Sequence, residues 1–516
     1  MNIKYILTAM VLLTVANSSH AAWTSAHGDS DNRSFANVAT RPATNVIRTV
    51  DVGHVAPGAN PVTAPDGTVY IGNTDGKLIA LHADGSPYWT RQLNPNHGGI
   101  YTAPVVGADG SVYVVSSSQF TEHRTGQVAG IHHNSFLHKF TPGGGWVFPM
   151  LFPTISPFVD RGGNTAAPNI WRANGAEAIM VPVVYQRPGV LDLRLIAFST
   201  NGGVLGNQSL SKVNYSTDVT GASGGTLGTT GYFLNCIFSP WNLILPGWEC
   251  DAGFSPGPYV PPLSDAGFPL PGVAIRPDPL GGMPQVVASG LHDTVVYSFS
   301  PAAGLAEVVR GTEKPNRFIA TPPVVLNNGL TAVGVNDSSS GYPYLRLLQG
   351  SNFPSVIPGF YTLTAGPTLL ADGRLVVISR YGTLFVLNGR ALVMQDTLNG
   401  ASIASAAASC SHLFVSSENE FRTYDLTNML IVASVPLQGG RHAPVIGPFG
   451  QVYALTEFSL NIFPAPRLRP GMNLLSGVCG GVLPPILTSV LIKPTVTPVI
   501  KPIVAPVVKA IAVMAR

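Results

Sequence analysis

Residues 61–71 read Pro-Val-Thr-Ala-Pro-Asp-Gly-Thr-Val-Tyr-Ile, and residues 104–115 read Pro-Val-Val-Gly-Ala-Asp-Gly-Ser-Val-Tyr-Val-Val. Each stretch consists of a proline, a short apolar run, an Asp-Gly pair and a second apolar run. Asp-Gly supplies the positive-φ residues that a tight hairpin turn needs, and apolar runs of this length are typical of strands. The two stretches therefore predict two copies of one β-hairpin.

Each hairpin continues into two more expected strands. The first copy runs on through an apolar segment at 76–81, a glycine turn at 83–85 and Tyr88-Trp89, and the second copy through 136–140, 143–145 and Trp146. Four strands in about 40 residues is the period of a β-propeller blade. Further copies follow at 168–198, 273–299, 323–348, 367–387, 412–424 and 444–463, of which the copy at 273–299 is the weakest.

The two ends of the repeat region complement each other. Residues 45–52 look like an outer strand with no repeat before it, and the last copy looks like three strands without a fourth. Pairing these segments would close the ring and remove two open sheet edges. We therefore expect an all-β fold, a single β-propeller of about eight four-stranded blades, with seven blades as the alternative.

The N-terminal residues 1–21 have the layout of a secretory signal peptide: Lys4, an apolar run at 5–15, then small residues at 19–21. A buried helix is the alternative. We expect an exported protein, periplasmic or extracellular, in which residues 22–466 form the propeller and residues 467–516 a Pro/Val/Lys-rich tail. The net charge of +3 is small and forms no basic stripe, so nucleic acid is not an expected partner.

Four cysteines follow the export segment, an even count that in an exported chain predicts two disulfides. Cys236 with Cys250 is the favoured pair because both lie in one aromatic segment, which leaves Cys410 with Cys479. All three pairings remain open, and free buried thiols are the alternative.

These repeats resemble the quinoprotein-like (PQQ-type) β-propeller repeat family. The Asp-Gly-x-Val-Tyr stretches at 66–71 and 109–114 carry the resemblance, together with 76–85 and Trp89. Trp23, His27-Gly28-Asp29 and Asn32 resemble the segment that often precedes the first blade in such proteins. The resemblance also identifies Trp89 and Trp146 as tryptophans of the family's docking position.

Some members of this family are calcium- and PQQ-dependent dehydrogenases, and others are non-enzymatic scaffolds, such as the propeller subunit of the outer-membrane barrel assembly machinery. The resemblance implies an adjacent Cys-Cys pair in the dehydrogenases, and this sequence has none. We therefore expect neither PQQ nor calcium, and no other cofactor. No cysteine directly follows the apolar run at 5–15, so we also do not expect the lipid anchor typical of the scaffold subunit.

Residues 207–270 form a long insertion between the third and fourth copies. The insertion is rich in aromatic residues and glycine and carries two of the cysteines, so it predicts either a binding surface or a loop that covers the propeller. Its candidate binding residues are Tyr232, Phe233, Phe238, Trp241 and Trp248.

Histidines gather in the second copy beside Glu122, in a segment that reads as a loop. Their spacing matches no compact metal site, so we expect solvated or hydrogen-bonded histidines, with a zinc or copper site as the weaker alternative. They are His123, His132, His133 and His138. Four acidic residues at expected loops or strand ends, Asp29, Asp75, Asp293 and Glu418, could line a propeller mouth.

The tail is apolar and free of acidic residues. Proline recurs at every fourth position, which excludes a continuous helix, makes a poor membrane span and favours extended structure. A docking segment for a partner or an anionic surface, extra strands on the rim, and a disordered tail are the alternatives. The prolines are Pro494, Pro498, Pro502 and Pro506, and the basic residues are Lys493, Lys501, Lys509 and Arg516.

The repeats are regular, and the sequence has no recognisable set of catalytic residues. Together these observations favour a non-enzymatic, protein-binding or envelope-assembly propeller. The expected partner is another envelope or extracellular protein. The alternative is a secreted enzyme, either a divergent quinoprotein oxidoreductase or a hydrolase or lyase that uses the propeller mouth. Acidic residues converging on the channel would favour the enzyme, and a plugged channel would count against it.

Overall fold

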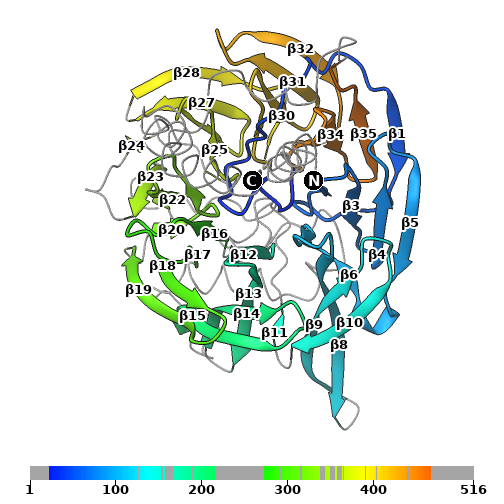
Figure 1. Ribbon diagram of the computed structural model, residues 1–516, viewed down its shortest axis with the longest axis vertical. Coiled ribbons are helices and arrows are strands. Elements are labelled where there is room, and N and C mark those ends of the chain that lie inside the picture. Colours follow the sequence, from blue (N-terminus) through cyan, green and yellow to red (C-terminus); the bar gives the residue numbers. More distant parts are fainter. Residues whose placement is uncertain are drawn as a thin grey trace, which may run out of the picture.

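Each repeat forms one antiparallel sheet, and eight sheets stand around a central axis as the blades of a propeller (Figure 1). In this computed structural model the described residues are 22–466 except 125–126, 153–154, 157–166, 188–189, 215–271, 291, 314–316, 338–342, 349–354, 357–362, 364, 390, 403 and 439–441. The all-β fold and the eight blades are confirmed, so the alternative of seven blades is excluded.

Strands are given from the inside of the ring outwards. Blade 1 has β2 (Val62–Thr63), β3 (Val69–Gly72), β4 (Lys77–Leu81) and β5 (Pro87–Gln92), followed by a short 3-10 helix, η1 (Pro95–His97). Blade 2 has β6 (Gly99–Ile100) with β7 (Val105–Val106), β8 (Val112–Arg124), β9 (Gln127–Phe140) and β10 (Trp146–Phe152). Blade 3 has β11 (Ile155–Ser156) with β12 (Asn169–Ala173), β13 (Ala176–Arg187), β14 (Val190–Ser199) and β15 (Val204–Asn214). Blade 4 has β16 (Val273–Arg276), β17 (Gln285–Ser289), β18 (Asp293–Ser300) and β19 (Gly304–Thr312).

The second half of the ring follows the same plan. Blade 5 has β20 (Arg317–Ile319) with β21 (Val324–Val325), β22 (Thr331–Asp337), β23 (Tyr344–Leu348) and β24 (Ser355–Val356). Blade 6 has β25 (Thr368–Leu369), β26 (Leu375–Ile378), β27 (Thr383–Asn388) and β28 (Ala391–Thr397). Blade 7 has β29 (Ala407–Ala408), β30 (His412–Ser416), β31 (Glu420–Asp425) and β32 (Ile431–Pro436). Blade 8 has β33 (Val445–Ile446), β34 (Val452–Leu455), β35 (Ser459–Phe463) and β1 (Arg48–Asp51).

The ring is closed by β1, as the sequence predicts. β1 runs antiparallel to β35, with Arg48 opposite Ile462 and Asp51 opposite Ser459. The first strand of the chain thus completes a blade whose other strands come from the last repeat, so neither end of the repeat region leaves an unpaired inner edge.

Burial follows the position of a strand within its blade. The second strands are buried throughout, as in β3, β26 and β34, because neighbouring blades cover both of their faces. The outer strands are largely exposed. The apolar core therefore consists of separate clusters wedged between adjacent blades, such as the one that joins blades 3 and 4 around Trp171 and Tyr297.

The indole of Trp89 also connects blade 1 to blade 2. Trp89 of β5 donates its Nε1–H to the carbonyl of Pro142 in blade 2, at 2.8 Å, and Gly144 of the same turn packs on the indole ring. Gly144 has φ +78°, and a Cβ there would lie 2.7 Å from the ring. Trp89 therefore occupies the docking position that the resemblance implies.

The prediction for Trp146 is wrong. Trp89 is paired with Ala80 in the third strand of blade 1. The equivalent of Ala80 in blade 2 is Lys139, and Lys139 is paired with Phe148. Phe148 contacts Gly202 in the next blade, whereas Trp146 is 49% exposed. The tryptophan lies two positions too early, because the strand begins directly after the Gly-Gly-Gly turn.

Candidate functional site

Residues 23–34 run once around the central channel and bind the inner strand of one blade after another (Figure 1). Their backbone carbonyls accept hydrogen bonds from backbone amides of six inner strands and from the Asn169 side chain of blade 3. The carbonyls of Trp23, Thr24, Ser30, Asp31, Arg33 and Ser34 accept from the amides of Thr63, Val106, Ile275, Val325, Leu369 and Ala408, at 2.7 to 2.9 Å. We call residues 23–34 the channel segment.

The hydrogen bonds between the channel segment and the inner strands follow one pattern, because the repeats have the same structure. In blades 1, 2, 5, 6 and 7 the donor is the last residue of the two-residue inner strand, whose amide faces the axis. Backbone groups buried in a channel need partners, and the channel segment supplies them. Blade 8 is joined next, when the chain leaves the channel and enters β1.

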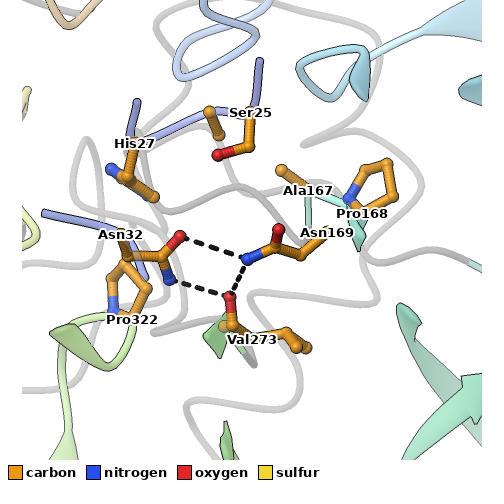
Figure 2. A pocket seen from close by; sticks show the side chains of 10 residues that line it. Ser25, His27, Asn32, Ala167, Pro168, Asn169, Val273 and Pro322 are labelled. Carbon is orange, nitrogen blue, oxygen red and sulfur yellow. Dashed lines mark hydrogen bonds between the residues drawn. The ribbon is translucent and has the colours of Figure 1, made fainter. Parts of the chain in front are cut away.

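Two asparagines fix the segment where it crosses blades 3 to 5 (Figure 2). The Asn32 amide donates to the carbonyls of Val273, at 2.8 Å, and Pro323, at 2.9 Å. The Asn169 amide donates to the same Val273 carbonyl at 2.8 Å and to that of Ser30 at 3.0 Å. Asn32 has φ +59°, a left-handed conformation that asparagine tolerates better than most residues.

A small cavity lies between the channel segment and blades 3 to 5. Its volume has room for about one water molecule. Six of the ten lining residues are prolines or other small or apolar residues, and the other four are the two asparagines, Ser25 and His27. The lining residues are Ser25, Ala26, His27, Asn32, Ala167, Pro168, Asn169, Gly272, Val273 and Pro322.

His27 is buried beside this cavity, with its Nδ1 3.5 Å from the Ser405 hydroxyl. Burial lowers the pKa of His27 to about 4, because the low-dielectric surroundings disfavour the imidazolium ion. The ring is therefore neutral at physiological pH.

Charged groups of the channel segment are engaged within the segment itself. Asp29 Oδ1 accepts the backbone N–H groups of Asp31, at 3.0 Å, and Arg33, at 3.2 Å, and the Arg33 guanidinium pairs with the Asp31 carboxylate at 2.5 Å. Burial raises the pKa of Asp29, with Arg33 opposing the shift. Burial and the neighbouring Asp29 charge raise the pKa of Asp31, again against Arg33.

Of the four acidic residues predicted for a mouth, only Asp29 reaches the channel. Asp75 lies in the β3–β4 turn of blade 1, Asp293 begins β18 of blade 4, and Glu418 lies in the β30–β31 turn of blade 7. Asp293 accepts from the Thr312 hydroxyl at 2.6 Å, and Glu418 from the Ala401 amide at 3.3 Å. These three carboxylates belong to separate blades and form no joint site.

The histidine segment of blade 2 is a long hairpin, so its interpretation as a loop is wrong. β8 and β9 pair from Val112–Phe140 out to Arg124–Gln127, and the hairpin projects from the ring (Figure 1). His123 is paired with Val128, whereas His132 and His133 are paired with Phe120 and Gln119. The backbone thus spreads these three histidines along the hairpin, and a metal site there stays a prediction.

His138 lies deeper, in the core of blade 2. It is fully buried, and its Nε2 lies 2.8 Å from the Ser116 hydroxyl. Ser116 donates to the carbonyl of His97, so His138 is the donor to Ser116 and its Nε2 carries the proton. Burial, and to a lesser degree His97, lowers the pKa of His138 to about 3. Among the described residues, no group of three or more His, Cys, Asp or Glu side chains could hold a metal ion.

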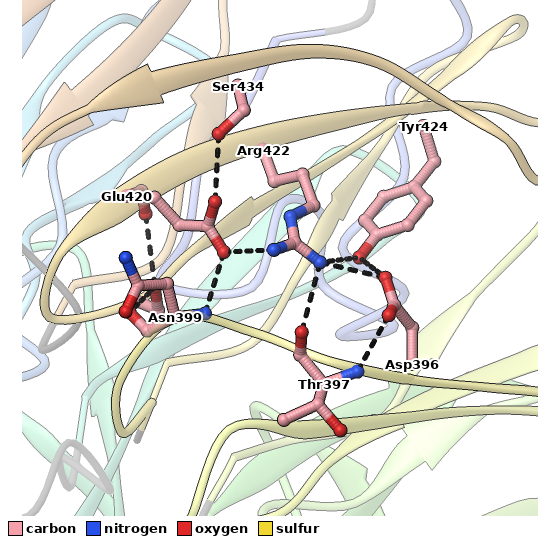
Figure 3. A network of polar contacts seen from close by, with 8 residues as sticks. Asp396, Thr397, Asn399, Glu420, Arg422, Tyr424 and Ser434 are labelled. Atoms are coloured by element: carbon pink, nitrogen blue, oxygen red, sulfur yellow. Dashed lines mark hydrogen bonds and ion pairs between the residues drawn. The ribbon is translucent and has the colours of Figure 1, made fainter.

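A polar network that the sequence does not predict joins blades 6 and 7 (Figure 3). Arg422 of β31 pairs with Asp396 of β28 at 2.8 Å and with Glu420, while the Tyr424 hydroxyl donates to Asp396 at 2.7 Å. Burial lowers the pKa of Arg422, but the hydrogen bond with the Tyr424 hydroxyl and the charges of Tyr424, Glu420 and Asp396 outweigh it, so the pKa is raised. The network ties the outer strand β28 to the neighbouring blade.

Several predicted residues lie outside the described part of the chain. The five aromatic candidates Tyr232, Phe233, Phe238, Trp241 and Trp248 are among them, as are Cys236, Cys250, Cys479, the segment 1–21 and the tail after residue 466. Cys410 lies half-buried after β29, and its pairing stays a prediction. Residues 207–214, assigned to the insertion, continue β15. Within the described ranges, no helix is long and apolar enough to cross a membrane.

Comparison with known proteins gives one family model and a set of related folds. Residues 15–132 match the model described as outer membrane protein assembly factor BamB. No curated protein matches the chain significantly.

Among solved structures, the chain is similar to quinohemoprotein alcohol dehydrogenase from Comamonas testosteroni, with a TM-score of 0.53 and 9% identity over 89% of this chain and 83% of that one. A europium-containing methanol dehydrogenase has a TM-score of 0.47 and 12% identity over 84% of this chain and 89% of that one. BamB from Moraxella catarrhalis has a TM-score of 0.34 and 11% identity over 74% and 97%.

At 9% identity the similarity to the alcohol dehydrogenase shows the fold alone. The family model adds the repeat type, because it covers the first two copies, in which the Asp-Gly-x-Val-Tyr pattern is clearest. The predicted resemblance to the quinoprotein-like (PQQ-type) repeat family is thus confirmed over the first two repeats, and the chain folds as an eight-bladed propeller.

Proposed function

We propose that the protein is an exported, non-enzymatic propeller that binds other proteins and acts as an assembly scaffold in the cell envelope. The lining of the channel carries this proposal. A propeller that binds a small substrate or cofactor on its axis needs free bonding groups there, and the channel segment occupies backbone amides of six inner strands.

The cavity beside the channel segment supports the same conclusion. With room for about one water molecule, it is too small for a tricyclic quinone, and its lining holds no carboxylate that could bind calcium. Neither PQQ nor calcium is therefore part of the proposal. Binding then falls to outer surfaces: the projecting β8–β9 hairpin, the aromatic segment 215–270 and the basic, apolar tail.

The family model matched by residues 15–132 adds support, since it describes an outer membrane assembly factor. The export sequence at 1–21 would place the protein in the periplasm or outside the cell. A protein partner in the envelope, and contact with an anionic surface through the lysines of the tail, fit this location.

The test is a pull-down from native envelopes, followed by reconstitution with the purified partner. Three forms are compared: the full mature chain, a chain truncated after Gly481, and a chain in which Trp241 and Trp248 are replaced by alanine. We expect a specific partner whose affinity for the full chain falls at least about tenfold on truncation or on loss of the tryptophans. Equal binding by all three forms would remove the tail and the aromatic segment from the proposal.

One observation favours an enzyme as the second candidate. Asp29 and Asp31 have raised pKa values and lie beside Arg33 at the channel, and such shifts cluster at catalytic sites. A secreted hydrolase, lyase or divergent oxidoreductase would use them as proton donors. Turnover of a substrate by the purified protein that is lost in Asp31→Asn, and kept in Asp75→Asn, would establish this candidate in place of the scaffold.

A further inference from the structure

The outer edge of blade 7 differs from the outer edges of the other blades. β32 ends the strand order β29-β30-β31-β32, and no described strand pairs with its outer side. Figure 1 shows it at the rim of the ring. An unpaired strand edge presents backbone N–H and C=O groups to any strand that reaches it, so proteins protect such edges with charges, prolines or short length.

The other outer strands carry this protection. Five of them, β5, β15, β19, β28 and β1, contain at least one charged residue. A proline interrupts β10, and β24 has only two residues. The protecting residues are Arg91, Lys212, Glu307, Arg310, Asp396, Arg48, Asp51 and Pro149. β32 reads Ile-Val-Ala-Ser-Val-Pro, without a charge and with proline only at its last position. It is thus the unprotected outer edge of the described ring.

Three neighbouring exposed side chains at the start of this edge are apolar. Leu430 is 62% exposed, Ile431 49% and Val432 40%, and they are consecutive. Consecutive residues of a strand face opposite sides of the sheet, so both sides of the edge are uncovered where the strand begins.

We propose that β32 pairs antiparallel with β32 of a second copy of the chain, forming a two-fold symmetric dimer through one continuous sheet. In such a contact each residue near the axis lies opposite its own copy or a close neighbour. A charged residue there would face a like charge, which destabilises a cross-strand pair. The uncharged sequence of β32 is what self-pairing requires, and it singles out a second copy over a charged partner strand.

The side chains are compatible with this register. With Ala433 on the axis, Ile431 lies opposite Val435 of the second copy and Val432 opposite Ser434. The first pair joins two β-branched side chains, and the small residues at the centre let the backbones approach. Pro436 has no N–H group, so the ladder ends there.

The area that such a contact buries is small, and this area determines how stable the dimer can be. A stable interface buries about 1,600 Å² in total, more than one pair of short strands provides. We therefore expect a reversible monomer–dimer equilibrium rather than an obligate dimer. This inference does not depend on the proposed scaffold function.

The experiment is sedimentation equilibrium of the full mature chain from about 1 to about 100 μM, a range that brackets a micromolar Kd. We expect concentration-dependent dimers, and at least a tenfold rise in dimer Kd in Val432→Lys. Val393→Lys on β28 is the matched control, because Val393 is also an exposed valine on an outer strand, one that already carries Asp396. It should leave the Kd unchanged.

Ile431→Lys provides a second test if Val432→Lys impairs folding, which thermal unfolding of each variant reveals. A wild-type chain that stays monomeric over the whole range overturns the proposal. So does a dimer that survives both lysine variants but is lost after truncation at Gly481, since self-association would then belong to the tail. Loss of partner binding with the dimer intact would affect only the scaffold function.

Discussion

The side chains of Asn32 and Asn169 meet in the channel with 3.4 Å between Oδ1 and Nδ2, and both amides donate to the carbonyl oxygen of Val273. One residue comes from the start of the chain and the other from blade 3, and the shared acceptor belongs to blade 4. The triple contact joins three parts of the chain that are distant in sequence.

Asn32→Asp should destabilise the protein by about 2 to 4 kcal/mol, because the isosteric carboxylate donates no hydrogen bond and faces two carbonyl oxygens. The measurement is the free energy of unfolding in denaturant. Asn45→Asp, an exposed change of the same type, is the control and should stay within about 0.5 kcal/mol of wild type. Equal effects of the two changes would show that the channel contact contributes nothing particular.

Deletion of residues 22–36 should expose the inner strands without removing a blade. We expect faster hydrogen exchange at the amides of Val325 and Leu369, because in the native protein these amides donate hydrogen bonds to carbonyls of the channel segment. Amides of the second strands, such as those of Val377 and Val415, should keep their protection. Uniform loss of protection would mean instead that the whole ring opens without the segment.

Gly144→Ala should cost about 1 to 3 kcal/mol, because a Cβ at φ +78° would lie against the Trp89 indole. Gly143→Ala is a matched control in the same turn, since a Cβ there meets no atom within 4 Å. Thermal unfolding of the two variants gives the comparison. Similar losses in both would contradict the docking role of the Trp89 contact.

Stability should fall as the solution is acidified below pH 6.5, in part because of His138. Its pKa is about 3 in the folded protein and near 6.5 in the unfolded chain, so the unfolded state takes up a proton first. This contribution is fully present above pH 6.5 and decreases by about 2 kcal/mol between pH 6.5 and pH 5. His138→Gln, which keeps a donor for Ser116, should flatten the unfolding free energy over that interval, and an unchanged slope would contradict the assignment.

Arg422→Met should be more damaging than loss of an exposed ion pair. It would leave Glu420, which is buried, and Asp396 without their cation, at a cost of about 2 to 4 kcal/mol. Arg374→Met, which breaks a pair with the exposed Asp372, should cost less than about 1 kcal/mol. Chemical denaturation distinguishes the two, and equal costs would show that the network in Figure 3 is no stronger than a surface pair.

The ring could be predicted from sequence because each blade repeats its local signals. The Asp-Gly turn at 66–67 and the apolar run that follows are sufficient to predict a hairpin, and the incomplete last copy predicts closure by residues 45–52. The error at Trp146 has the same origin: residue type alone does not fix the register after a turn of three glycines.

The channel segment could not be predicted in this way. Its bonds use backbone carbonyls, which every residue has, so no side-chain pattern between Trp23 and Ser34 reveals them. Asn32 is the one local signal, as a residue suited to a left-handed conformation. The Arg422 network is invisible for a related reason, since Asp396 and Arg422 belong to different repeats and meet only once the blades are placed side by side.

The course of residues 23–34 sets the order in which this protein can be completed. The segment is made before any blade exists, yet its bonding sites are spread over strands that end with Ala408, and β1 needs β35, nearly at the end of the repeats. Trp23 and Thr24 can bind blades 1 and 2 early, but the rest of this part of the chain waits for its partners until more than 400 residues have been synthesised and arranged. Contacts of such long sequence separation form late and slowly, so we expect the native state to be reached in a final step that fixes both ends of the propeller region at once.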